Sequence, residues 1–112
     1  MNYKIGISEK FLLELGIILA SHKITQVLFF GSRNSGDFTE TSDLDLIVLE
    51  PKNIELKSWA ILKLDLEESN IPIKIDIQRY ESVSARFLKL ITAQSSVWNI
   101  SQKGIIETVD IK

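Results

Sequence analysis

The sequence predicts a single α/β (α+β) domain in which helices flank one small mixed sheet. Its 112 residues suit one domain. The 45% apolar and 25% charged fractions are typical of a folded globular chain rather than a disordered one. Segments with helical spacing alternate with β-branched and aromatic segments, in the order helix, strand, turn, strand, helix, strand, helix. This alternation favours a layered domain in which helices cover a sheet.

The chain begins with a predicted helix, a strand and a polar loop. Ser8 can cap a helix over residues 9–22, in which apolar side chains recur at spacings of three and four. Residues 24–30, Ile-Thr-Gln-Val-Leu-Phe-Phe, are β-branched and aromatic and predict a buried strand. Residues 31–42 are rich in Gly, Ser, Asn, Asp and Thr, which predicts a loop with one helical turn opened by Ser32.

The second half of the chain predicts two more strands and two more helices. Residues 43–49 predict a strand, and Asn53 can cap a helix that ends near residue 68. Residues 73–78 alternate isoleucine with polar residues, which is the period of a half-buried strand. A last helix is expected from Ser82 or Ser84 to about residue 93. Its expected inward side chains are Phe87, Leu88 and Ile91.

The last segment of the chain, residues 95–112, is apolar without a clear period. It is expected to be a C-terminal tail to a core of about residues 8–93, within one domain over residues 1–112. Trp98 in this segment can either cover the core or contact a partner, and the sequence favours neither.

Composition and charge exclude several kinds of function. The net charge of −2 disfavours binding of extended nucleic acid. The lack of cysteine excludes disulfides, thiolate zinc sites and cysteine nucleophiles, and the single histidine, His22, excludes a two-histidine metal site within the chain. The N-terminus does not resemble a targeting segment, and no apolar run approaches the ~20 residues that span a bilayer. We therefore expect a soluble, cytoplasmic protein that does not bind membranes.

Acidic residues gather where the chemistry is expected. Residues 34–51 contain five carboxylates and no Lys or Arg, a costly clustering unless water or a cation screens it. Asp43 and Asp45 lie two apart on a predicted strand, so they are expected to share one face, roughly 7 Å apart. Asp76 lies between core-type isoleucines on the next strand and can join them if the strands are neighbours. Three such carboxylates can hold two metal ions of the kind that assist phosphoryl or nucleotidyl transfer.

The turn after the first strand provides possible phosphate donors. Gly31 lets the backbone approach phosphate oxygens closely, and the amides that follow it can donate to them. The Ser32 hydroxyl can add another donor, and Arg33 can form charge-assisted bonds to phosphate. These donors complement the acids, which would hold the metal of a nucleoside triphosphate.

Other motifs fit poorly. The spacing from Gly31 to Gly36 matches a P-loop, but Asp37 stands where the phosphate-binding lysine belongs. The Asp-x-Asp pair of aspartyl-phosphate hydrolases follows an apolar strand, whereas here the apolar strand follows the pair. A calcium loop requires glycine at the position that Val48 occupies.

The string Gly-Ser-Arg-x-x-Gly-Asp-x-x-x-x-Ser-Asp-Leu-Asp-Leu over residues 31–46 resembles the minimal nucleotidyltransferases of the DNA polymerase β-like superfamily. The resemblance covers about residues 8–93 and implies the polymerase β-like fold. It also implies Mg²⁺, with two ions, and ATP as the substrate. The implied catalytic and metal-binding residues are Asp43, Asp45 and Asp76, and the implied nucleotide-binding residues are Gly31, Ser32 and Arg33.

Minimal members of this superfamily resemble antitoxins whose partner is a helical HEPN-type toxin. The resemblance therefore implies transfer of AMP to a tyrosine of such a partner and a possible hetero-oligomer with it. Two alternatives stay open at this point: a catalytically weak module that neutralises its partner by binding, and a nucleotidyltransferase that acts on a small molecule. The nucleotide base, the acceptor atom and the oligomeric state are not determined by the sequence.

Overall fold

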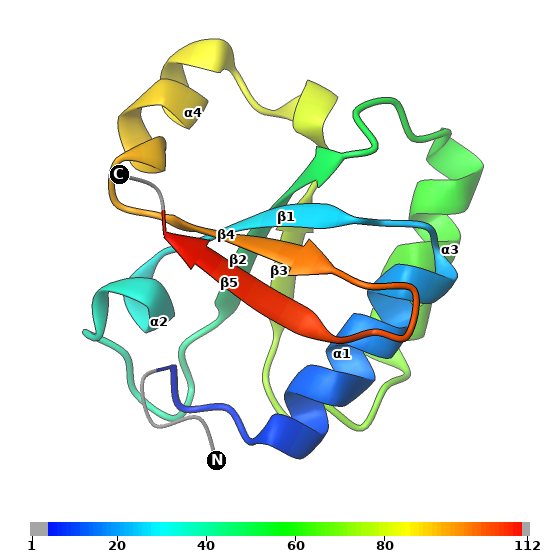
Figure 1. The fold of residues 1–112 in the computed structure, drawn as a ribbon, viewed down its shortest axis with the longest axis horizontal. Helices are drawn as coiled ribbons and strands as arrows, with labels where there is room; N and C mark the ends of the chain where they lie inside the picture. The colour runs from blue at the N-terminus through cyan, green and yellow to red at the C-terminus, as the bar shows by residue number, and fades with distance from the viewer. Residues whose placement is uncertain (1–4, 111–112) are drawn as a thin grey trace.

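The structure, a computed structural model, describes residues 5–110 and is organised around one mixed sheet of five strands (Figure 1). The strand order is β3-β2-β1-β4-β5, with β2 and β3 parallel and the other neighbouring pairs antiparallel. The ends of the predicted domain, residues 1–4 and 111–112, lie outside the described residues. In chain order the elements are α1 (Glu9–Ser21), β1 (Gln26–Phe30), α2 (Ser32–Ser35), β2 (Leu44–Glu50), α3 (Leu56–Glu67), β3 (Ile75–Gln78), the 3-10 turn η1 (Tyr80–Ser82), α4 (Ala85–Thr92), β4 (Ser96–Ile100) and β5 (Ile106–Asp110).

This architecture confirms the predicted fold class, a small mixed sheet flanked by helices. The helix caps follow the sequence signals. The Ser8 hydroxyl accepts a hydrogen bond from the amide of Phe11 at the start of α1, and the Ser84 hydroxyl accepts one from the amide of Phe87 at the start of α4. The predicted single turn of helix at Ser32 is α2. No helix within residues 5–110 has the length and apolar character needed to cross a membrane.

Several element boundaries differ from the prediction: β1 and β3 each begin two residues later than expected, at Gln26 and Ile75. Helix α3 begins at Leu56, not at residue 53, and Asn53 does not cap it. The amide of Ile54 donates to the Glu81 carboxylate at 3.4 Å. Strand β2 begins at Leu44, whose amide donates to the carbonyl of Lys74, so Asp43 precedes the strand rather than lying on it.

The C-terminal segment is part of the sheet. Strands β4 and β5 form a hairpin, and β4 pairs with β1 in the centre of the sheet. The ring of Trp98 on β4 packs 4.6 Å from that of Phe29 on β1, and Trp98 is buried. This settles the choice that the sequence left open for Trp98: its side chain belongs to the core.

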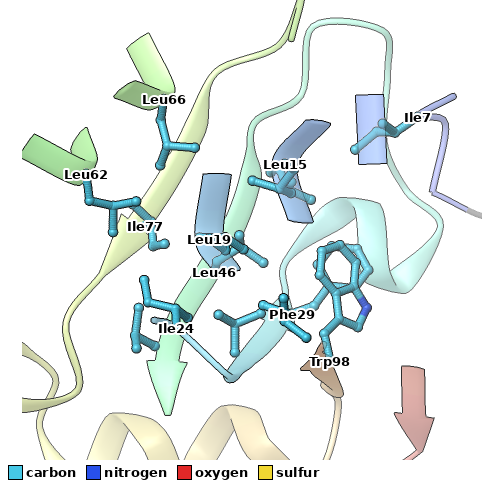
Figure 2. Close-up of a cluster of buried hydrophobic side chains, with 14 of the residues drawn as sticks. Ile7, Leu15, Leu19, Ile24, Phe29, Leu46, Leu62, Leu66, Ile77 and Trp98 are labelled. Atoms are coloured by element: carbon cyan, nitrogen blue, oxygen red, sulfur yellow. The ribbon is translucent and has the colours of Figure 1, made fainter. Parts of the chain in front are cut away.

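Helices α1 and α3 cover one face of the sheet, and the core lies between them and the strands (Figure 2). Leu15 and Leu19 on α1 and Leu62 and Leu66 on α3 pack there. The apolar side chains that the strands contribute to this cluster are Val27, Phe29, Leu44, Leu46, Val48, Ile77, Trp98 and Ile100. Because side chains alternate along a strand, the residues between these point to the other face of the sheet.

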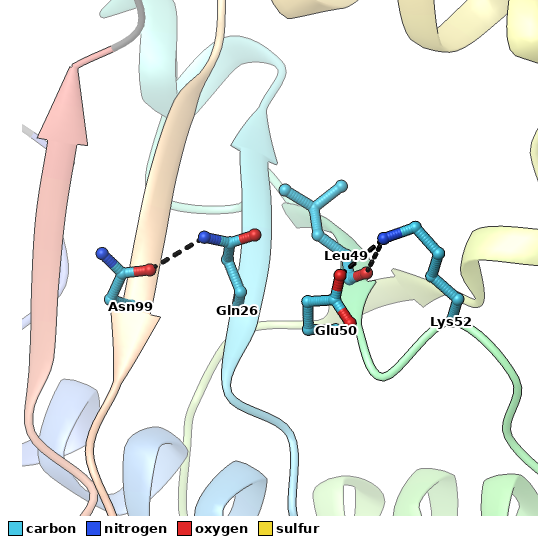
Figure 3. Close-up of polar contacts among 5 residues, drawn as sticks. All are labelled: Gln26, Leu49, Glu50, Lys52 and Asn99. Atoms are coloured by element: carbon cyan, nitrogen blue, oxygen red, sulfur yellow. Dashed lines mark hydrogen bonds and ion pairs between the residues drawn. The ribbon is translucent and has the colours of Figure 1, made fainter.

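The other face carries more polar side chains and is less covered by helices (Figure 1), although Leu28 and Ile47 on it are buried. Figure 3 shows the Gln26 amide on β1 donating to the Asn99 side chain on β4 at 3.0 Å, with Lys52 bonded to Glu50 nearby. Helix α4 stands apart from α1 and α3 (Figure 1). None of its eight residues, all within the described chain, is fully buried. The inward packing predicted for this helix is therefore only partial: Leu88 and Ile91 are half-buried, and Phe87 meets Phe30 but stays exposed.

Candidate active site

Two of the predicted acids lie side by side on the less covered face. In the parallel pairing of β2 with β3, Asp45 is the direct partner of Asp76. Neighbouring strands are about 4.8 Å apart, and residues paired in register project their side chains to the same side. Both aspartates are partly exposed, so a ligand can reach them. The structure therefore brings together the acids that the sequence could only place on separate strands.

Asp43 lies close to this pair although it is not on the strand. The pKa of Asp45 is raised first by burial and then by the negative charges of Asp76 and Asp43. Charges repel in this way only when they are near one another and poorly screened. The three aspartates thus form one acidic cluster around Asp45, held at an electrostatic cost that a cation would relieve.

The cluster is not a complete metal cage. Within residues 5–110, no three acidic or histidine side chains are placed to ligate one ion together. The chemistry of the donors nevertheless suits a hard cation such as Mg²⁺, which prefers oxygen ligands and is commonly held by one or two carboxylates together with substrate phosphates. The residues therefore fit a metal whose coordination is completed by a bound nucleotide.

Gly31 lets the turn between β1 and α2 lie close to the acids. It has φ +82° and ψ −165°, a conformation that is essentially restricted to glycine. A Cβ atom at this position would overlap Asp45 Oδ2. The residue before it, Phe30, is the direct partner of Asp45 in the β1–β2 pairing. The turn that leads to Ser32 consequently passes directly over the carboxylate, with no side chain between them.

The structure turns the side chain of Arg33 away from the acids. Its side chain is only 1% exposed, and burial lowers its pKa from the ordinary value. The guanidinium instead lies over the ring of Phe38 and holds two loops together. It donates to the carbonyls of Ile5 (2.8 Å), Ser42 (3.0 Å), Glu40 (3.2 Å) and Thr39 (3.3 Å).

This placement corrects the predicted phosphate contact of Arg33. A buried guanidinium that already gives four of its five N–H donors to carbonyls has no access to a triphosphate. Its bond to Ser42 holds the carbonyl immediately before Asp43. Arg33 therefore acts on the site indirectly, by fixing the loop that presents Asp43.

Sequence reasoning missed Asn34, which fixes the turn from its other side. The Asn34 amide donates to the carbonyl of Gln94 at 2.6 Å, and the hydroxyl of Ser96 donates to the Asn34 side-chain oxygen at 2.8 Å. These bonds tie α2 to the start of β4. No local signal reveals the contact, because its partners are about sixty residues away in sequence.

His22 lies outside the site. It ends α1, and its ring contacts the Asp65 carboxylate of α3 at 2.6 Å. Both helices cover the face opposite the acidic cluster, so this pair serves the packing of the helices.

Comparison with known protein families gives a match that includes the candidate site. Residues 14–102 match the family model described as polymerase beta, nucleotidyltransferase. The matched residues run from α1 to the turn after β4 and contain Gly31, the three aspartates and Asn34. The comparison with curated proteins found no match.

Proposed function

This chain belongs to the polymerase β-like nucleotidyltransferase family, and we propose on that basis that it transfers a nucleoside monophosphate from a nucleoside triphosphate to a hydroxyl group. The observation that carries the proposal is the geometry around Asp45. Asp76 is its partner on one side, and the Gly31 turn lies against its carboxylate on the other. Acids for a metal and a close-approach turn for phosphates are the two parts that this chemistry requires.

In this proposal Asp43, Asp45 and Asp76 would hold Mg²⁺ together with the phosphates of the substrate. Bound Mg²⁺, in two ions, would neutralise phosphate charge and orient the reacting groups. Gly31 and Ser32 hold the triphosphate through backbone amides and the Ser32 hydroxyl. Arg33 has no direct role.

The transfer is a displacement at the α-phosphorus. The acceptor hydroxyl oxygen forms a bond to that phosphorus while the bond to the oxygen bridging to the β-phosphorus breaks, so pyrophosphate leaves. The hydroxyl proton passes to the Asp76 carboxylate. The chain contributes mainly by positioning the two reactants and by placing fixed charges beside them.

We further propose ATP as the donor and a tyrosine of a HEPN-type toxin as the acceptor, with the chain acting as its antitoxin. What supports this is the resemblance of residues 31–46 to minimal nucleotidyltransferases. The partly exposed acids also suit an acceptor that is supplied by another protein, because a protruding tyrosine can reach them.

The test is incubation of the purified chain with ATP labelled at the α-phosphate, Mg²⁺ and the product of the neighbouring gene, which the proposal expects to be a HEPN-type protein. We expect label on the partner with the natural chain and none with Asp43→Asn. Glu40→Gln is the matched control, because it removes an exposed carboxylate from the same loop outside the cluster. Transfer that is equal in Asp43→Asn and the natural chain, or absent in both, would reject the proposal.

A binding module without catalysis is the second candidate. It is favoured by one observation, the lack of a complete three-ligand metal group within the described residues. It predicts that the double variant Asp43→Ala, Asp45→Ala still protects cells from the partner toxin. Loss of protection in that variant would exclude it.

A further inference from the structure

A row of side chains crosses the less covered face of the sheet and ends on α4. Asp76 pairs with Asp45, and Asp45 pairs with Phe30 on β1. The ring of Phe30 meets that of Phe87 on α4 edge to face, with centroids 6.1 Å apart and planes at 80°. Two acids and two aromatic rings are therefore consecutive neighbours across three strands and one helix.

The aromatic end of this row is open to solvent. Phe87 is 40% exposed although it is a large apolar side chain, and α4 buries none of its residues. An edge-to-face contact covers at most one face of one ring, so ring surface is left available for stacking. Small-molecule sites are commonly lined by aromatic side chains beside a few polar groups, which is the combination that this row presents.

We propose that Phe30 and Phe87 form the subsite for the base of the nucleotide, with the base stacked on the Phe87 ring. This inference rests on the proposed function, because it assigns the remaining part of the same ligand. Phe30 directly precedes Gly31, the residue that would hold the phosphates. A triphosphate held by the Gly31 turn and the acids leaves its base to lie at one end of the row, and the aromatic end offers the matching chemistry.

The chemistry of the subsite also indicates its selectivity. Stacking on an aromatic ring is tolerant of base identity, because every base has a π-face. A purine offers more ring area than a pyrimidine and therefore gains more from the same contact. The subsite thus favours purine over pyrimidine nucleotides and does not by itself separate adenine from guanine.

Binding of Mg²⁺–ATP and of Mg²⁺–tripolyphosphate to the full chain, measured by calorimetry, separates the two parts of the site. Tripolyphosphate has the phosphates but no base. Phe87→Leu keeps an apolar side chain without the ring, and Phe87→Trp keeps a ring. Leu90→Ala is the matched control, since Leu90 lies on the same helix and is 68% exposed.

We expect Phe87→Leu to bind ATP about tenfold more weakly, the range typical of losing one stacked base, with tripolyphosphate affinity unchanged. Phe87→Trp and Leu90→Ala should bind both ligands as the natural chain does. Equal losses for both ligands in Phe87→Leu, or no loss for ATP, would overturn the subsite. If the natural chain binds ATP normally but Phe87→Leu impairs only partner binding, α4 is a protein contact and the base proposal is wrong. Failure of the natural chain to bind tripolyphosphate would instead reject the proposed function.

Discussion

Replacing Arg33 by methionine should destabilise the protein without removing any group that touches a substrate. The substitution keeps the apolar stem but leaves four carbonyl oxygens without their donor. The bond to Ile5 is buried, and a carbonyl orphaned there costs about 1–3 kcal/mol. The other three bonds are partly buried, so their carbonyls regain water in part. Relief from burying the guanidinium offsets some of the loss. We expect a net loss of roughly 3–4 kcal/mol, a large share of the 5–15 kcal/mol typical of a domain.

Urea denaturation followed by circular dichroism measures this loss, and hydrogen exchange locates it. The amides of Thr39 and Ser42 are bonded within the loop that Arg33 holds, so their exchange should accelerate more than that of the strand amides. Arg86→Met is the control, because Arg86 is exposed on α4 and should change stability by less than about 0.5 kcal/mol. A loss of stability below about 1 kcal/mol for Arg33→Met, with unchanged exchange at Thr39, would refute the role of Arg33 in holding the two loops together.

Three other substitutions test the site and the core. Asp45→Asn should raise the melting temperature by a few degrees at neutral pH, because the raised pKa of Asp45 means that its ionised form opposes folding. This gain is full above the raised pKa and should vanish as the pH falls to the ordinary carboxyl value; a gain independent of pH would contradict it. Gly31→Ala should lower stability by about 1–3 kcal/mol through backbone strain, and it should also abolish nucleotide binding because the new methyl group overlaps Asp45. Gly36→Ala should lower stability through strain alone, because Gly36 has φ +94° and open space around it. Calorimetric binding that is equal in the two glycine variants would argue against the close approach. Trp98→Ala should lower the free energy of unfolding by about 3–5 kcal/mol, as expected of a core residue that is 2% exposed. A loss below about 1 kcal/mol would contradict the placement of Trp98 in the core.

Local patterns in the sequence were sufficient for the elements that they encode directly. The Ser8 and Ser84 caps, the alternation around Asp76 and the Gly31 turn each depend on a few neighbouring residues, and the structure has all of them. The meeting of Asp45 with Asp76 needed one further assumption, that the two strands are neighbours. The β2–β3 register confirms it.

Features that depend on distant partners could not be predicted in this way. Strand β4 is short, and its place in the sheet is set by pairing with β1, some seventy residues earlier. The direction of the Arg33 side chain depends on carbonyls from two loops, whereas the sequence shows only a cation near a phosphate-type turn. Helical spacing likewise predicts which side chains of α4 face inward, but not how deeply they are buried, because that depends on what packs against the helix; Leu88 and Ile91 are only half-buried.

The proposed cation site is tested most directly by the paramagnetic resonance of Mn²⁺, which takes the same oxygen ligands as Mg²⁺. The signal of free Mn²⁺ would be followed as the protein is added with a non-hydrolysable ATP analogue. We expect the natural chain and Glu40→Gln to bind the ion together with the nucleotide, and Asp45→Asn to lose that binding. Equal binding by Asp45→Asn would show that the aspartates do not form a metal site and would contradict the proposed chemistry.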